Sequence, residues 1–421
     1  MRLRIALPIA ILAFPGSAAA NPSFQGVLQL TGVRGDNLAV SDAGDGTGVP
    51  PEDMNFRISP GLNISYERPR HVHLVSTSLN LNLFPQRDEA TSLSTRLNWN
   101  GQITPSKRSE LTMGASVVYG RTNLFNVETE STTVTLDDLG QAGGSYLNAG
   151  LTEVLFHELS PTWRGMQAAT LQRFILMSDA GDTTTDVLEG RLGADRTWKR
   201  DAAGLDLRLG HSKTNRPTGS EPGRIISGLV GRWRHVFEAN WMARGEAGTQ
   251  IVMRTDGEQL AFKPFAGAGA YYYREAGGGA ELTYFHSTEP NVFLGEVQQV
   301  DRLRLRLGLP LGATGLSFAT SAGYQRGRTI LADGNMAEGV NVFIADAALS
   351  WRGSEYMTVA LRYQLYNREA DDETGAPSYV RNVFMVSVAA RYPSDMGAEL
   401  RYPALLRMVG QGQPGSEGAQ R

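Results

Sequence analysis

The chain has 421 residues, a formal net charge of -3, 41% hydrophobic residues and no cysteine. The near-neutral charge argues against a nucleic-acid partner, because no basic field would attract phosphates. The lack of cysteine excludes disulfides, iron–sulfur clusters, Cys-ligated zinc and thiol catalysis, and it suits an oxidising compartment. Glycine is abundant at 48 residues and proline is scarce at 19. This composition is neither collagen-like nor disordered, and it favours one large closed architecture.

The first twenty residues predict an export signal. Met1-Arg-Leu-Arg4 is positively charged, residues 5–14 are almost entirely apolar, and small residues end the stretch at Ala20. This order is typical of a signal peptide cleaved after Ala20, and the apolar run is shorter than the ~20 residues of a spanning helix. No later stretch reaches 18 consecutive apolar residues, so we expect no transmembrane helix in the mature chain.

Beyond the signal, segment after segment alternates apolar and polar residues, which is the pattern of a strand with two different faces. The clearest is 301–309, where leucine occupies every second position from 303 and arginine lies between the leucines. In chain order the predicted strands are 22–33, 55–67, 71–84, 91–102, 109–121, 145–156, 162–177, 184–198, 204–213, 223–237, 241–254, 262–273, 279–288, 300–309, 315–327, 340–352, 355–368 and 379–392.

The predicted connections alternate in length along the chain. Segments 34–54, 122–144 and 369–378 are long and acidic, whereas turns such as 68–70 and 103–108 are short and mixed or basic. An up-and-down barrel places alternate connections at opposite ends, and outer-membrane barrels have long extracellular loops and short periplasmic turns. Aromatic residues near the strand ends fit interfacial girdles, although aromatics also suit ordinary strand packing.

The Leu303-Arg-Leu-Arg-Leu307 pattern, the export signal and the loop alternation together resemble a bacterial outer-membrane β-barrel. The resemblance implies an all-β, transmembrane up-and-down antiparallel β-barrel of about 18 strands (16–18) over residues 21–392, in the outer membrane of a Gram-negative bacterium. Such barrels commonly end in an aromatic residue, here Tyr392, but residues 393–421 follow it. Either 379–392 or a segment such as 396–402 therefore closes the barrel, and 393–421 is expected to be a largely disordered periplasmic tail.

A barrel of 16–18 strands is wide enough for an aqueous channel. The predicted inward faces are polar and rich in arginine, which favours anionic or hydrogen-bonding solutes unless genome composition alone explains the arginines. The row of arginines at 302–306 would form a positive ladder unless neighbouring strands supply acids such as Glu246 or Glu281. The candidate lumen and selectivity residues are Arg302, Arg304, Arg306, Arg232, Arg234, Arg208, Arg244 and Arg362, and Arg196 and Arg326 are assigned to inward faces as well.

Signals for catalysis or for a metal are weak. No HExxH or G-x-S-x-G sequence occurs, and His71 and His73 lie beside a predicted periplasmic turn, which favours an interfacial pair over a metal site. Ser-Asp-Ala-Gly-Asp occurs at 41–45 and at 178–182. Paired aspartates can hold Ca²⁺ between lipopolysaccharide phosphates, but neither copy completes an EF-hand loop, and a solvated acidic turn is favoured. We expect no enzyme activity, cofactor or metal.

Three functions remain, led by a transport channel. A barrel-embedded hydrolase would need a serine or aspartate and a histidine converging at one rim, and a structural or assembly role is the third. The first strand follows the cleavage site directly, without the plug of a gated importer, which favours an open or partner-gated pore.

The size and strand number are also similar to those of the exopolysaccharide-export porins of gliding soil bacteria, which implies a glycan cargo and a periplasmic polysaccharide-export partner. The alternative is a diffusion porin for small anionic solutes, constricted by an inward fold of 122–144. In either case the expected partners are outer-membrane lipid, lipopolysaccharide and the transported solute or glycan.

Overall fold

The computed structural model of the chain describes residues 22–36, 52–85, 91–121, 145–178, 181–220, 222–238, 240–257, 260–274, 278–291, 296–312, 315–331, 335–370 and 378–393. The predicted signal peptide, loop 122–144, the first Ser-Asp-Ala-Gly-Asp copy and the tail from 394 lie outside these residues. Within the described part of the chain, no helix is long and apolar enough to cross a membrane.

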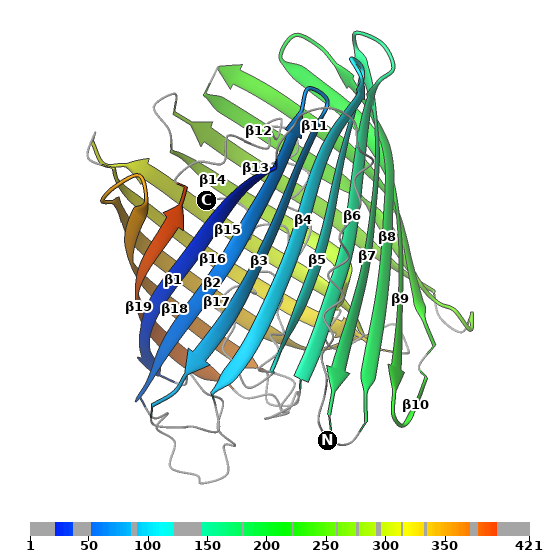
Figure 1. Cartoon of the computed structure of the whole chain (residues 1–421). Helices are drawn as coiled ribbons and strands as arrows, with labels where there is room; N and C mark the ends of the chain where they lie inside the picture. The colour runs from blue at the N-terminus through cyan, green and yellow to red at the C-terminus, as the bar shows by residue number, and fades with distance from the viewer. Residues whose placement is uncertain are drawn as a thin grey trace.

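Strands account for almost all of the described residues (Figure 1). They are β1 (Ser23–Asp36), β2 (Glu52–Arg68), β3 (His71–Leu83), β4 (Ser92–Ser106), β5 (Ser109–Arg121), β6 (Ser145–Glu158), β7 (Trp163–Met177), β8 (Thr183–Thr197), β9 (Asp201–Arg216), β10 (Gly219–Ser220), β11 (Arg224–Glu238), β12 (Trp241–Arg254), β13 (Leu260–Tyr273), β14 (Gly279–Asn291), β15 (Glu296–Pro310), β16 (Leu316–Ile330), β17 (Met336–Arg352), β18 (Met357–Ala370) and β19 (Tyr379–Tyr392).

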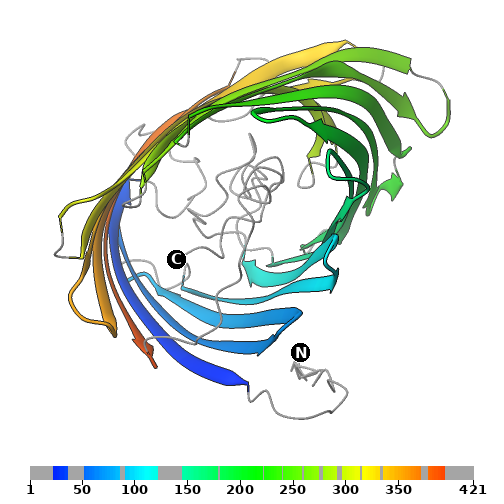
Figure 2. The same ribbon diagram turned by 90° about the horizontal axis from the view of Figure 1, so that it is seen from above.

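Within the described residues, these strands form a closed antiparallel barrel of 18 strands, which confirms the predicted fold class. Each strand pairs with the next except at β10, a two-residue strand that pairs only with β9, so that β9 pairs directly with β11. Seen from above, the strands form a continuous ring (Figure 2). β19 pairs with β1, with Tyr392 opposite Gly26, so residues 379–392 close the barrel. The alternative closing segment, 396–402, lies outside the described residues.

The two faces of the wall differ as the alternation predicts. Leucines such as Leu209, Leu303 and Leu305 are 52%, 45% and 49% exposed, and they form an apolar outer belt. Charged and amide side chains such as Asp206 and Gln250 lie on the inner face and are buried. An apolar belt on the outside of a barrel with a polar interior is stable only when lipid covers the belt.

Aromatic residues mark one end of the barrel. All six tryptophans, Trp99, Trp163, Trp198, Trp233, Trp241 and Trp351, lie towards the end that carries short turns such as 69–70 and 107–108. Short turns are periplasmic in outer-membrane barrels, so this girdle marks the periplasmic interface. His73 stacks between His71 and Trp99 in the same girdle, with ring-centroid distances of 6.4 and 5.9 Å. No group of three or more metal-ligating side chains occurs among the described residues.

Several strands extend further at the extracellular end than the alternation predicts. β15 begins at Glu296 rather than at 300, because its first residues, Glu-Val-Gln-Gln, do not alternate. Two arginines assigned to the lumen are on the outer face instead. Arg196 shares the sequence parity of the exposed Leu192 and lies over the Trp198 ring, with 5.3 Å from its guanidinium carbon to the ring centroid. Arg326 likewise shares the parity of the exposed Tyr324.

Candidate functional site: the lumen wall

All eight arginines predicted to line the lumen lie on the inner face. Seven of them adjoin an exposed outer residue, as Arg208 does between Leu207 and Leu209, and Arg244 shares the parity of the buried Met242. The structure gathers four of the eight on one side of the barrel, on β9, β11 and β12. Three more form the row on β15, and Arg362 lies apart from both groups on β18. The β9–β12 group is Arg208, Arg232, Arg234 and Arg244.

Two of these four arginines, Arg208 and Arg232, are cross-linked by carboxylates, together with Arg191 of β8. The Asp206 side chain is 0% exposed and lies within 4 Å of three guanidinium groups. Arg191 Nε donates to Asp206 Oδ2 at 2.6 Å, and Arg232 Nη2 is 2.7 Å from Asp206 Oδ1. Arg208 Nη2 donates to Glu246 Oε2 at 2.9 Å. Planar guanidinium groups suit such a lattice because each presents several donors in a fixed geometry.

Two glycines leave room for these carboxylates. A Cβ atom at Gly193 would lie 2.1 Å from Asp206 Oδ1, and one at Gly204 would lie 2.0 Å from Asp195 Oδ1. Asp195 in turn is 2.8 Å from Arg232 Nη2. The small residues on the inner faces of β8 and β9 are therefore part of the charge network.

Aromatic rings support the same arginines from the β13 side. The Arg208 guanidinium carbon lies 4.3 Å from the centroid of Phe265, and that of Arg244 lies 4.9 Å from Phe285 and 5.6 Å from Tyr271. Cation–π contacts of this kind hold a guanidinium in place without cancelling its charge. Phe265 and Tyr271 are buried. They support the arginines and do not present open stacking faces to a solute.

The arginine row on β15 is partly neutralised. Arg302 Nη2 donates to Glu289 Oε1 at 2.9 Å, and Arg302 Nε donates to Gln325 Oε1 at 3.2 Å. Glu281 lies opposite Arg306 in the β14–β15 register. Of the two acids that the sequence offered as partners, Glu281 is therefore beside the row, whereas Glu246 belongs to the β9–β12 network.

Sequence reasoning missed the partners of several predicted arginines, among them those of Arg302 and Arg362. Glu289 binds Arg302, although the two are diagonal rather than directly opposite in the register. Asp346 on β17 binds Arg362. Hairpin pairing could have indicated Asp346, because it and Arg362 lie near each other across the short turn at 353–356. No local signal indicates Glu289, since its segment lies beyond the predicted end of the strand.

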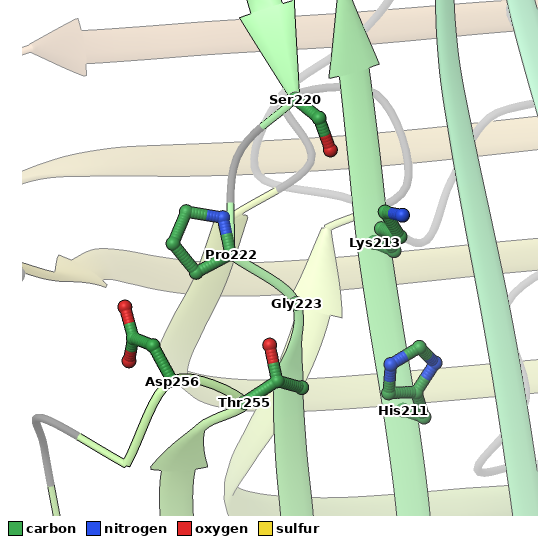
Figure 3. Close-up of a pocket in the computed structure, with 7 residues that line it drawn as sticks. All are labelled: His211, Lys213, Ser220, Pro222, Gly223, Thr255 and Asp256. Atoms are coloured by element: carbon green, nitrogen blue, oxygen red, sulfur yellow. The ribbon is translucent and has the colours of Figure 1, made fainter.

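A separate cavity of about 510 Å³ lies at the extracellular rim (Figure 3). Its lining includes His211 and Lys213 from β9 and Thr255 and Asp256 from the β12 end. His211 has the parity of the exposed Leu209, so this cavity is on the outer side of the wall and not in the lumen. Asp256 is already ion-paired with Arg254 at 2.5 Å.

Two histidines make contacts that resemble parts of a hydrolase triad. Ser109 Oγ is 2.8 Å from His157 Nδ1 at the periplasmic rim. Separately, Asp201 contacts His235 Nδ1 at 2.8 Å. Within the described residues, the serine–histidine pair has no carboxylate bonded to the histidine, and the aspartate–histidine pair has no serine. A complete nucleophile, base and orienting acid is therefore not assembled there.

No family model and no curated protein matches the chain. Solved structures match at low identity. The FrpB iron transporter from Neisseria meningitidis (F5-1 variant) has a TM-score of 0.51 and 8% identity, covering 89% of this chain and 83% of that one. OccK2 (OpdF) from Pseudomonas aeruginosa, in complex with glucuronate, has a TM-score of 0.45 and 12% identity, covering 88% of this chain and 98% of that one. At such identities the similarity concerns the fold, which is that of an outer-membrane β-barrel.

Proposed function

We infer that the protein is a channel of the outer membrane that passes small hydrophilic solutes with a preference for anions. The observation that carries this proposal is the contrast between the faces of the wall: leucines such as Leu305 are exposed outside, whereas arginines and their carboxylate partners line the inside. Fixed charges on the inner wall can select solutes only if water and polar solutes enter the lumen.

The preference for anions rests on the β14–β16 side of the lumen. Arg302, Arg304 and Arg306 share the inner face of β15, and β14 offers them two inward carboxylates, Glu281 and Glu289. The β16 residues opposite the row are Gln325, Gly323 and Ser321, none of which is charged. This strip therefore carries more positive than negative charge.

Reversal potentials in planar lipid bilayers under a salt gradient test the proposal. Changing Arg302, Arg304 and Arg306 together to Gln should shift selectivity towards cations, with conductance of the same order. Glu289→Gln should shift it towards anions, because it removes the carboxylate that neutralises Arg302. Arg196→Gln is the matched control, since Arg196 lies on the outer face. If the reversal potential is the same after both lumen changes, the arginine row does not line the permeation path. A complete lack of conductance would refute an autonomous channel.

Polysaccharide export, with its periplasmic partner, stays a prediction from the resemblance. The charged side chains of the lumen wall, such as Arg208 and Glu246, support small charged solutes more directly than a glycan. The small-anion channel is therefore the function that we place first.

A further inference from the structure

The ladder between β13 and β14 ends before either strand does. The last pair is Ala266 with His286, although β13 continues back to Leu260 and β14 continues to Asn291. Extending the register by two residues would place Thr288 opposite Pro264. Proline has no N–H, so this position cannot supply a full ladder. Beyond the break, residues 287–291 and 296–300 form what we call the inner hairpin.

A side chain from β12 takes the place of the missing strand partner. Gln250, which is buried on the inner face of β12, donates from Nε2 to the Thr288 carbonyl at 3.0 Å and accepts from the Thr288 N–H at 2.8 Å. β12 and β14 are separated by β13 in the barrel. The contact is possible only because the inner hairpin lies inside β13, against the lumen side of β12.

Apolar packing holds the outer face of the inner hairpin to the wall. Val297 of the hairpin, Ile226 of β11, Val252 of β12 and Ile330 of β16 form one buried cluster. Arg224 Nη1 donates to the Ile330 carbonyl at 3.0 Å, which joins β11 to the end of β16 across the same layer. The hairpin is therefore a second layer of sheet inside β11–β13, and stacked sheets are spaced by about 10 Å.

The base of the hairpin is anchored immediately below the break. His286 Nδ1 is 2.7 Å from Asp301 Oδ1, and the Tyr284 hydroxyl donates to the same oxygen at 3.0 Å. The far part of the hairpin stays paired with β16, where Gln298 lies opposite Thr329 and the Thr329 hydroxyl donates to Glu296 Oε2 at 3.0 Å. The hairpin and the end of β16 therefore form one unit, which is held to β11 and β12 by side-chain contacts and not by a strand ladder, so the unit can move relative to that wall.

We propose that the inner hairpin is a movable constriction that sets the size limit of the solutes passing the channel. Seated on β11–β12, it narrows the extracellular end by one sheet layer. Returned to β13, it would exchange the two Gln250 bonds for an incomplete ladder at Pro264 and widen the lumen. This proposal rests on the channel function inferred above, and it adds the element that decides how large a solute can be.

A reversible staple tests it, because the chain contains no native cysteine. Val252→Cys with Val297→Cys should form a disulfide, which requires Cβ atoms about 3.5–4.5 Å apart. If the hairpin stayed in the barrel wall, β12 and β15 would be three strand spacings apart, about 14 Å, and the bond could not form. Val154→Cys with Ala168→Cys is the matched control, because these buried residues face each other on the adjacent strands β6 and β7 and belong to a separate cluster that does not include the hairpin.

The readouts are disulfide yield and swelling of proteoliposomes in sugars of increasing size. We expect the oxidised Val252–Val297 staple to lower the size limit relative to the reduced form, and the control staple to leave it unchanged. Gln250→Leu and Pro264→Thr should each raise the limit. A high disulfide yield with the same size limit in both redox states would overturn the proposal, as would the absence of the disulfide. If no variant swells in any sugar, the channel function fails, whereas the disulfide yield still reports where the hairpin lies.

Discussion

Asp206 is the residue whose loss should disturb the lumen wall most. Asp206→Asn removes a carboxylate that is 0% exposed and lies among Arg191, Arg208 and Arg232. Removing one partner of a buried ion pair typically costs about 3–5 kcal/mol. Arg232 keeps Asp195 at 2.8 Å and Arg208 keeps Glu246 at 2.9 Å, so Arg191 bears most of the loss. The Arg191 side chain is 20% exposed and can recover some hydration in a wet lumen. We therefore expect a value near the lower limit, about 3 kcal/mol.

Urea unfolding of the barrel in lipid vesicles, followed by the fluorescence of the girdle tryptophans, measures this loss. Adding Arg191→Gln to Asp206→Asn should recover part of it, because the uncompensated charge is then absent, and a double-mutant cycle isolates that coupling. Asp346→Asn is the control, since it breaks a single pair with Arg362, whose side chain is 31% exposed. Equal losses for Asp206→Asn and Asp346→Asn, or no recovery in the double variant, would refute the idea that Asp206 holds the wall together.

Two further changes test the assignment of faces and the packing of the network. Leu305→Arg places a charge in lipid near the middle of its strand, which should cost about 2–4 kcal/mol of stability, whereas Arg304→Leu should allow assembly. Heat-modifiable gel mobility measures the assembly of both variants. Equal assembly defects would show that the inner and outer faces are assigned wrongly. Gly204→Ala places a methyl group 2.0 Å from Asp195 Oδ1, so we expect a loss of about 1–3 kcal/mol in the same urea assay. Gly190→Ala, whose nearest atom is at 3.9 Å, should be close to neutral, and a similar loss at both glycines would contradict the crowding argument.

The strands and their faces could be predicted from the sequence because both depend on local alternation. A strand that separates lipid from water must place every second side chain in lipid, and Leu303, Leu305 and Leu307 show this without any knowledge of their neighbours. The closing strand 379–392 was found at its correct bounds for the same reason, although the sequence left its role open. Arg196 and Arg326 are charged yet lie on the outer face, because position along the strand and not charge decides the side on which a residue lies.

The partners of the arginines and the inner hairpin were decided only by tertiary structure. Arg208 on β9 reaches Glu246 on β12 across the intervening β11, a contact that requires the curvature of the closed wall. Gln250 can bind Thr288 only after the β13–β14 ladder has ended at Ala266. Alternation specifies which side of a sheet a residue occupies, but not which residue faces it across several strands. That information resides in the closure of the barrel and in the fold of its strands into the lumen.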